Sequence, residues 1–589
     1  MSHALRSRII LLVIVLLGLA LRFYGINWDQ GLHLHPDERM LIMVATPMRF
    51  FANLNPDFFN YGSLPIYLLV ATGQLVEFIT SSDYSSYDGL LVVGRFLSAL
   101  ADTVTVVLIY RLARKLFHQT SIGLFAAFCY ALFFFPIQNA HFFTVDVFLT
   151  MIAALLVLLL LGYLEQPTMI GLMKLSIASA AAVTTKISAL IFFPIIAAGI
   201  ILPHIQSRKP RVVLLFFSSF VLLTVLFTFL FMPYAFILPY RQVIANCGSV
   251  LSFINVTCPI AVEQLPVVRD ILLQMKMNSD PFIFPYTLQY VGTTPYWYYL
   301  KNIFFWGMGP VFSVVSLMGL IRLIRHMRLI KEKPEVALMI FFYLLYFLVI
   351  GRSAVKFMRY MLPLYPAFAL LTGYALYRIS EFRIQNSEFV NRYVPRTITA
   401  VLLLVALFWT SMFMSIYSRE HTRITASKWI YENIPSGSTL AVEHWDDRLP
   451  LPLAQQSTFR FEELALYEPD TDKKWSYINQ QLEISDYIII ASNRLYIPLT
   501  KLTQCEKLPP GKCFPITAQY YHELFNGKRG FTKVAEFSSY PHLSIDGLPA
   551  RNAFGLRWPA WRLTFYDDNA DESFTVYDHP KVMVFQKNM

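Results

Sequence analysis

Long apolar runs separated by short polar segments fill the first 417 residues of the chain. A helix needs about 20 apolar residues to cross roughly 30 Å of hydrocarbon. On that basis we predict about eleven transmembrane helices, near 8–26, 90–112, 120–138, 145–163, 169–184, 187–204, 212–233, 300–321, 335–351, 358–378 and 397–417. The run at 64–79 is also apolar, and we expect it to form a helix lying at the membrane interface.

The pattern changes after residue 417: charge and proline content rise and long apolar runs end. A helix is predicted over 421–434, stopped by Pro435 and Gly437. Short β-like runs follow at 439–442, 487–491, 532–537 and 581–585. The sequence therefore predicts a polytopic α-helical membrane protein, with a membrane domain over 1–417 whose first external loop is 27–89, and a C-terminal extracytoplasmic α/β domain over 418–589.

Composition agrees with the membrane assignment. The chain is 56% hydrophobic and only 15% charged, whereas an average soluble domain carries about 25% charged residues. The formal net charge of +11 does not indicate a nucleic-acid partner, because the basic residues fall in short clusters between apolar runs. We expect the first apolar run to be a retained span, since no convincing signal-peptide cleavage site follows it.

The basic clusters also predict sidedness. They lie near residues 6–8, 111–115, 208–211, 322–333 and 378–396, and all face one compartment in the predicted topology. The positive-inside rule makes that compartment the cytoplasm. We therefore expect a multi-pass plasma-membrane protein with a cytoplasmic N-terminus, and with the loops 27–89, 139–144, 234–299 and 352–357 and the C-terminal domain outside.

The cysteines support this sidedness. Cys247 and Cys258 share one predicted external loop, and Cys505 and Cys513 share the C-terminal domain. Two local pairs on the external side fit disulfides in an oxidising compartment. Zinc is the weaker alternative, because no pair has CxxC spacing.

Polar residues at the predicted outer ends of separate spans form one group. Its members are Asp37, Glu38, Arg95, Asp146, Lys186, Arg352, Lys356 and Arg359. Together they place acids and bases at one membrane face. Cations at such a face can hold a lipid-linked phosphate, and a carboxylate can deprotonate an attacking hydroxyl or amine.

The acidic members also have simpler interpretations. Asp37 and Glu38 are alternatively solvated loop acids, although carboxylates are costly near a bilayer without a function. Asp146 alternatively interacts with the dipole at its own helix N-terminus. His33 and His35 lie close to Asp37 and offer metal ligands, but their spacing is not a specific metal signature.

The basic members have alternatives as well. Arg95 and Lys186 alternatively snorkel to the interface. Arg352, Lys356 and Arg359 run against the positive-inside bias, so for them contact with lipid phosphate headgroups is the alternative to a catalytic role.

These residues, in this order, resemble a known family. The motifs are Asp37-Glu38, Tyr61-Gly62-Ser63-Leu64-Pro65, the segment Arg95–Leu100, Asp146 and Thr185-Lys186. They resemble the GT-C glycosyltransferases that use polyprenyl-phosphate sugars, and especially family 39, which contains the protein O-mannosyltransferases and is similar to the lipid A aminoarabinose transferases. The segments Gly292–Tyr296, Trp306–Gly309, Lys356–Pro363, Glu443–Asp447 and Asp571–Pro580 resemble a prokaryotic branch of such proteins.

The resemblance implies an enzyme that transfers a hexosyl or pentosyl group from a polyprenyl-phosphate carrier to an extracytoplasmic lipid, glycan or protein acceptor, with inversion. The implied roles are a general base for Asp37, support of that base for Glu38, and orientation of the acceptor or of a partner group for Asp146. Phosphate binding is implied for Arg95 and Lys186, with Lys356 and Arg359 as further candidates. Candidates for contacts with the acceptor or the sugar are Tyr61, His35, His141 and Trp445, with Trp558 and Trp561 as further stacking platforms. The family is treated as needing no cofactor, so a divalent metal is not expected.

Two hypotheses from other classes compete with transfer. A transporter or flippase for a lipid-linked glycan would place ionisable groups near mid-membrane, often in inverted repeats, whereas here they lie at one face. A non-catalytic scaffold that binds cell-wall polymer through the external domain would not need acids in the first loop.

Overall fold

The computed structural model describes residues 2–205, 210–255, 257–325, 334–382, 388–453, 457–544 and 562–588. The chain divides into two units. Unit 1 comprises Met1–Ile26, Pro36–Lys276 and Thr294–Thr410, and unit 2 comprises Asn27–His35, Met277–Thr293 and Ser411–Met589. Two short segments from the predicted membrane domain, one of them in the first loop, thus belong to the same unit as the C-terminal region.

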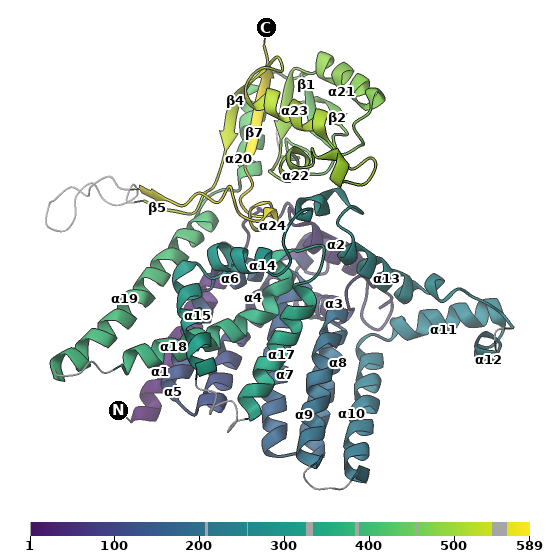
Figure 1. Cartoon of the computed structure of the whole chain (residues 1–589). Helices are drawn as coiled ribbons and strands as arrows, with labels where there is room; N and C mark the ends of the chain where they lie inside the picture. The colour runs from purple at the N-terminus through teal and green to yellow at the C-terminus, as the bar shows by residue number, and fades with distance from the viewer. Residues whose placement is uncertain are drawn as a thin grey trace. The chain divides into compact units, whose positions relative to one another are not determined.

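The membrane region is helical (Figure 1). Its α-helices are α1 (His3–Phe23), α2 (Pro36–Ala45), α3 (Leu64–Thr80), α4 (Tyr87–Phe117), α5 (Thr120–Leu132), α6 (Phe134–Ala140), α7 (Val145–Glu165), α8 (Met169–Val183), α9 (Phe193–Ile205), α10 (Pro210–Phe231), α11 (Tyr234–Cys247), α12 (Val250–Ile254), α13 (Pro266–Ser279), α14 (Trp297–Asn302), α15 (Pro310–Arg325), α17 (Pro334–Ile350), α18 (Tyr365–Ser380) and α19 (Glu388–Met414). Short helical turns include η1 (Ile187–Phe192), η3 (Pro285–Tyr290), η4 (Ile303–Gly307) and η5 (Met358–Leu364).

Several of these helices suit a bilayer, and the chain is a multi-pass membrane protein. Six helical stretches in the described residues are long and apolar enough to cross, and the pair α5–α6, bent by 59°, makes a seventh. The eleven spans predicted from the sequence exceed this count. The difference arises because some apolar runs fold as shorter pieces: α8 is a short apolar helix, and the turns η4 and η5 interrupt the runs at 300–321 and 358–378.

Local sequence explains where the longest helix of unit 1 begins and ends. Ser86 accepts a hydrogen bond from the backbone N–H of Gly89 and caps the N-terminus of α4. Arg114 and Lys115 lie in the last turn, where cations complement the helix dipole. His118 then adopts a left-handed conformation that ends the helix. The 31-residue helix carries Arg95 on its N-terminal half and Asp102 near its middle.

A buried ion pair joins three helices of unit 1. Arg22 on α1 donates to Asp102 on α4 at 2.6 Å, and the hydroxyl of Tyr130 on α5 donates to the other carboxylate oxygen of Asp102. Arg22 also donates to the backbone carbonyls of Gly18 and Ala131. An intramembrane charge is costly unless it is paired and hydrogen-bonded, and here both charges have several partners. This network fixes α1, α4 and α5 together.

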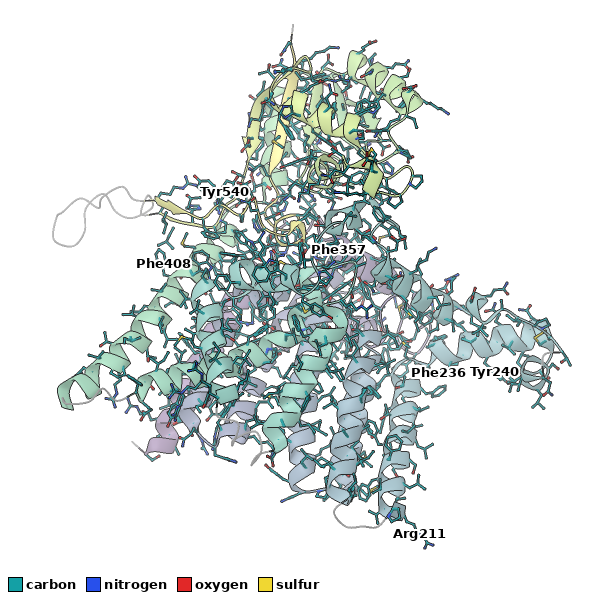
Figure 2. All side chains as sticks on the ribbon, viewed as in Figure 1. Arg211, Phe236, Tyr240, Phe357, Phe408 and Tyr540 are labelled. Carbon is teal, nitrogen blue, oxygen red and sulfur yellow. A yellow bond between two sulfur atoms is a disulfide. The ribbon has the colours of Figure 1, made fainter. Side chains whose placement is uncertain are left out.

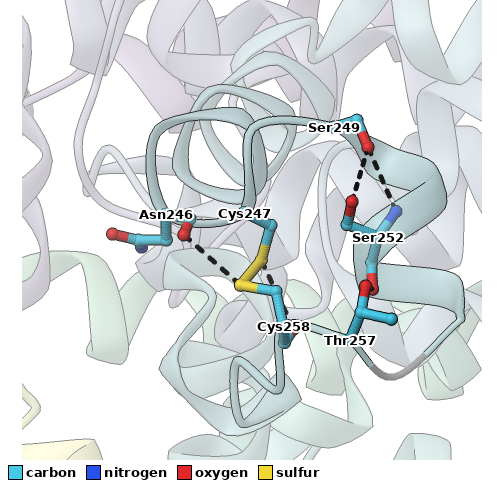
Figure 3. The surroundings of a disulfide bond; sticks show 6 residues. All are labelled: Asn246, Cys247, Ser249, Ser252, Thr257 and Cys258. Carbon is cyan, nitrogen blue, oxygen red and sulfur yellow. Dashed lines mark hydrogen bonds between the residues drawn. A yellow bond between two sulfur atoms is a disulfide. The ribbon is translucent and has the colours of Figure 1, made fainter.

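The helices α7 to α10 lie side by side, and α11 leads away from α10 (Figure 1). Arg211 marks one end of α10, while Phe236 and Tyr240 on α11 lie beyond the other (Figure 2). A disulfide between Cys247 and Cys258, with Cα atoms 5.3 Å apart, closes the segment after α11 (Figure 3). The predicted pairing is confirmed here and for Cys505–Cys513, whose Cα atoms are 5.2 Å apart.

Unit 2 contains a five-stranded sheet of order β2-β1-β3-β7-β4. The strands are β1 (Thr439–Glu443), β2 (Arg460–Leu464), β3 (Tyr487–Ile490), β4 (Phe531–Phe537) and β7 (Val582–Lys587), with a separate hairpin of β5 (His542–Ser544) and β6 (Arg562–Thr564). Its helices are α20 (Thr422–Asn433), α21 (Asp472–Ile484), α22 (Ile497–Lys501), α23 (Pro515–Phe525) and α24 (Glu572–Thr575), and short turns lie at η6 (Ser415–Ser418) and η7 (Cys505–Lys507). The four predicted strands correspond to β1, β3, β4 and β7.

Strand direction brings the carboxyl ends of four strands of this sheet to one edge. β1 pairs in parallel with β2 and β3, while β7 is antiparallel to both β3 and β4. The carboxyl ends of β1, β2, β3 and β4 therefore all lie at the same edge. β1 and β3 are buried throughout, as expected of strands covered on both faces.

Candidate active site

Asp37 lies in the first turn of α2, a helix that begins at Pro36. Its carboxylate forms an ion pair with the guanidinium of Arg359, with Nη2 and Oδ2 2.8 Å apart. About a quarter of the Asp37 side chain is exposed. Asp37 is therefore held by a specific cation and still accessible, which is not the state of a freely solvated loop acid.

Asp146 joins the same group from the first turn of α7. Lys186 donates to Asp146 Oδ1 at 2.7 Å, and Arg359 Nε lies 3.8 Å from Asp146 Oδ2. The ion pairs thus link Asp37, Arg359, Asp146 and Lys186, which come from four separate segments of the chain. Because Asp146 lies in the first turn of α7, its carboxylate also interacts with the dipole of that helix. The helix-dipole interaction and the ion pairs are thus both present. We call these four residues the ion-pair chain.

Aromatic rings pack against both cations of the ion-pair chain. Lys186 Nζ lies 4.4 Å from the ring centre of Tyr360. The Arg359 guanidinium carbon lies 4.5 Å from the ring centre of Phe357, which Figure 2 labels on the segment before η5. Cation–π contacts of this kind hold a cation in place without neutralising it. Lys186 is therefore positioned rather than snorkelling freely.

Glu38 and Arg95 form a second, fully buried pair. Arg95 donates to both carboxylate oxygens of Glu38, at 3.0 and 2.8 Å, and Glu38 also accepts from the backbone N–H of Phe143 at 2.9 Å. Arg95 donates in addition to the carbonyl of Ile26. Because Arg95 is only 2% exposed, the snorkelling alternative is wrong for this residue. The pair ties α2 to α4 and to the segment before α7.

The segment Tyr61-Gly62-Ser63 packs directly against the residues before Lys186. The backbone N–H of Gly62 donates to Thr185 O at 3.1 Å, and that of Leu64 donates to Thr184 O at 3.0 Å. A Cβ on Gly62 would lie 1.9 Å from Thr184 O, so only glycine fits there. Burial and then the nearby charge of Asp37 raise the pKa of the Tyr61 phenol well above its usual range. Tyr61 therefore lies within electrostatic reach of the ion-pair chain.

Lys356 is a buried cation just before η5. It is 3% exposed, and burial lowers the pKa of its ammonium group. Its hydrogen bond in the described residues goes to the carbonyl of Ala354 at 2.9 Å. An ammonium group has three donors, and this hydrogen bond accounts for one of them. The neighbouring Arg352 is exposed.

The candidates for sugar or acceptor contact have other surroundings. His141 is buried, with its ring nitrogens 2.8 and 2.9 Å from the carbonyl oxygens of Ile137 and Tyr24. In unit 2, the ring of His35 lies 4.0 Å from that of Tyr577. The contacts of these two histidines with an acceptor or a sugar stay predictions.

Trp445 also belongs to unit 2, where it is 37% exposed. Trp558 and Trp561 lie outside the described residues. Among the residues that the structure describes, His, Cys, Asp and Glu form no group of three or more that could hold a metal ion. The His33/His35 metal alternative gains no geometric support, and the expectation that no metal is required stays a prediction.

Sequence reasoning missed three contributors to this region: Phe357, Tyr360 and Gly62. The two aromatic residues lie inside a segment already singled out for its cations, so alternation of basic and aromatic residues was the available signal. Gly62 lay inside a quoted motif, but its close approach to Thr184 joins segments more than 100 residues apart. No local pattern encodes such a contact.

A protein-family model matches part of the chain. Residues 88–233 match the family described as dolichyl-phosphate-mannose-protein mannosyltransferase. The chain resembles this glycosyltransferase family. The match covers α4 to α10, and it includes Arg95, Asp146 and Lys186. The resemblance expected from the motifs is thus confirmed over this stretch. No curated protein matches the chain.

Solved structures of glycosyltransferases are also similar to the chain. An oligosaccharyltransferase from Archaeoglobus fulgidus in the apo form is 13% identical, covering 84% of this chain and 71% of that one, with a TM-score of 0.48. ArnT from Cupriavidus metallidurans bound to undecaprenyl phosphate is 12% identical, covering 85% of this chain and 94% of that one, with a TM-score of 0.45. The arabinofuranosyltransferase AftD from Mycobacteria is 14% identical, covering 100% of this chain and 40% of that one, with a TM-score of 0.30.

Proposed function

We propose that the chain transfers a sugar from a polyprenyl-phosphate carrier to an acceptor outside the cytoplasm, with inversion at the anomeric carbon. The observation that carries the proposal is the ion-pair chain, in which four segments bring two acids and two cations together. The family match supports the reaction class, since that family is named for a lipid-phosphate-linked mannose donor.

We propose Asp37 as the general base, and its accessibility supports this choice. The side chain of Asp37 is 25% exposed, whereas those of Asp146 and Glu38 are 2% and 0% exposed. A base must come within hydrogen-bond reach of the proton that it removes, and only Asp37 of these three is accessible to an acceptor. Asp146 then orients Lys186 and Arg359 rather than touching the acceptor.

The balance of charges supports a proposal for the phosphate site. The ion-pair chain contains two carboxylates and two cations, and Glu38 balances Arg95. Lys356 adds one positive charge with no carboxylate partner in the described residues. A polyprenyl-phosphate sugar is a phosphodiester with a single negative charge. We therefore place the donor phosphate at Lys356, with Arg359 close to it in the sequence as a second contact.

The proposed step balances as a single displacement. Asp37 takes the proton from the acceptor hydroxyl or amine, and the acceptor atom attacks the anomeric carbon opposite the phosphate. The new glycosidic bond forms while the bond from the anomeric carbon to the phosphate oxygen breaks, and both bonding electrons leave with the carrier phosphate. Lys356 and Arg359 stabilise the charge that develops on that phosphate. A single displacement needs one catalytic carboxylate and inverts the centre.

Glu38 and Arg95 act as positioning residues in this scheme. Their pair is buried, and both partners are hydrogen-bonded to the backbone of neighbouring segments. Glu38 follows Asp37 directly in α2, so fixing Glu38 fixes the base. The resemblance implied phosphate binding for Arg95; we propose a positioning role instead, and its two hydrogen bonds to Glu38 support that role.

The test is direct detection of product. Purified full-length protein in lipid nanodiscs is incubated with polyprenyl-phosphate sugars and candidate lipid, glycan and peptide acceptors, and mass spectrometry follows the products. The proposal expects one added sugar on an acceptor, release of the carrier phosphate and inverted configuration by NMR. Movement of labelled carrier across vesicles without cleavage would instead indicate a transporter. Retention of configuration would contradict the single displacement.

A further inference from the structure

A cavity of about 330 Å³ lies within unit 2. Its volume falls at the lower end of the range for small-molecule sites, about 300–1,000 Å³. All of its lining residues belong to the C-terminal part of the chain, between Asn493 and Lys581. None of them takes part in the transfer proposed above.

The cavity lies where a sheet of this type binds ligands. Asn493 follows the carboxyl end of β3, Ser539 follows the carboxyl end of β4, and Lys581 immediately precedes β7 between them. In open α/β sheets, ligands bind outside the carboxyl ends of the strands, because the loops there diverge around a crevice. The position of the cavity therefore follows from the directions of the strands.

Two polar groups in the cavity wall have no described partner. Ser539 and Asn493 are 5% and 7% exposed, and neither Ser539 Oγ nor Asn493 Oδ1 has a hydrogen-bond partner among the residues that the structure describes. The amide nitrogen of Asn493 is already committed to Thr575 at 3.3 Å. A buried polar group without a partner is destabilising. Ser539 Oγ can therefore donate a hydrogen bond to a ligand or accept one from it, and Asn493 Oδ1 can accept one.

The charged groups of the cavity wall are paired with one another. Asp567 and Asp568 pair with His579 and Lys581 respectively, and Asp578 pairs with His579 from outside the lining. Burial alone would lower the pKa of His579, but Asp578 and Asp567 outweigh it and raise the pKa to about 10, so the ring is an imidazolium at neutral pH. Each charge already has an opposite partner. Both cations of the lining are already paired, so a charged ligand would bring a charge for which the lining offers no free counter-ion, whereas a neutral polar ligand would not.

Aromatic residues complete the wall. Tyr540, labelled in Figure 2, lines the cavity, donates its hydroxyl to Asp568, and has the ammonium group of Lys581 5.3 Å from its ring centre. Tyr496 lines the cavity as well. Arg419 donates to the carbonyls of Ser539 and Tyr540, which fixes the segment after β4. Aromatic rings pack on apolar C–H faces, and the neighbouring polar groups can hydrogen-bond with hydroxyls. A ligand that has both features therefore suits this wall.

We propose that this cavity is a binding site for an uncharged saccharide, separate from the site of transfer. Sugar hydroxyls satisfy the unpaired Ser539 and Asn493 atoms, and a sugar ring face packs on the tyrosine rings. The inference does not depend on the proposed transfer reaction, because it concerns other residues and is read out by binding alone.

The experiment measures binding to the full-length protein in nanodiscs by saturation-transfer NMR and calorimetry. The neutral probes are glucose, mannose, galactose and N-acetylglucosamine, and the charged probes are glucuronate and glucose 6-phosphate. Ser539→Ala removes one unpartnered hydroxyl and is expected to weaken binding of a neutral probe roughly tenfold without lowering the melting temperature. Ser538→Trp places a bulky ring on an exposed lining residue and is expected to abolish binding.

The matched control is Ser436→Trp, the same change on an exposed serine before β1, at the opposite edge of the sheet. It is expected to bind as the unaltered protein does. The proposal is overturned if no neutral probe binds, if only the charged probes bind, or if Ser538→Trp binds as well as Ser436→Trp. Loss of transfer activity has no bearing on these outcomes.

Discussion

Replacing Gly62 by alanine tests whether the contact between the first loop and the Thr184–Lys186 segment positions the site. The new Cβ would lie 1.9 Å from Thr184 O, 2.2 Å from its carbonyl carbon and 2.8 Å from the nitrogen of Thr185. Real Cβ atoms do not approach closer than about 3.0 Å, so backbone must move by about 1.1 Å. The atoms that the new Cβ would meet belong to the backbone and not to a flexible side chain. The clash therefore cannot be relieved at a low energetic cost.

That displacement reaches the chemistry through Lys186, which directly follows Thr185 and pairs with Asp146. A misplacement of about 1 Å costs on the order of 100-fold in rate when positioning is critical. We therefore expect kcat for sugar transfer to fall roughly 100-fold in Gly62→Ala, measured with saturating carrier-linked donor. The control is Gly162→Ala on α7, where an added Cβ meets no atom within 4 Å. Full activity in Gly62→Ala would refute the positioning argument.

Three further outcomes follow from the contacts. Glu38→Gln leaves the buried Arg95 guanidinium without its carboxylate and is expected to cost about 3–5 kcal/mol of stability, seen as a lower melting temperature; an unchanged melting temperature would contradict the pairing. Lys356→Gln is expected to raise KM for the donor about tenfold or more while changing kcat less, and equal donor affinity would exclude Lys356 from the phosphate site. Burial raises the pKa of Glu443 to about 8, so stability should fall as pH rises from about 4.5 to 8; Glu443→Gln should flatten this profile and the exposed-residue control Glu432→Gln should not.

The helical architecture could be predicted because the length of an apolar run and the spacing of cysteines are local signals. Every predicted apolar run falls on helical segments, and both cysteine pairs form. The number of full-length spans could not be predicted. A hydropathy run does not reveal a bend such as that between α5 and α6, nor a turn such as η5, because backbone breaks depend on packing against neighbouring helices.

The sequence predicted which residues lie in the candidate site better than it predicted which of them pair with each other. Acids and bases at span ends were visible in the sequence, but which acid meets which cation depends on how α2, α4, α7 and η5 pack. Glu38 and Asp37 are adjacent, yet one pairs with Arg95 and the other with Arg359. The buried pair of Arg22 and Asp102 was missed, although charges inside apolar runs are the signal for such a network.

The central claim is that Asp37 removes the acceptor proton at a site whose cations hold the carrier phosphate. Its most direct test is the transfer rate of Asp37→Asn, with donor binding measured in parallel and Asp57→Asn, an exposed acid of the same loop, as control. The account predicts a loss of about 10²–10⁴-fold in kcat, with donor affinity retained and the control fully active. Turnover by Asp37→Asn at the rate of the unaltered protein would contradict it.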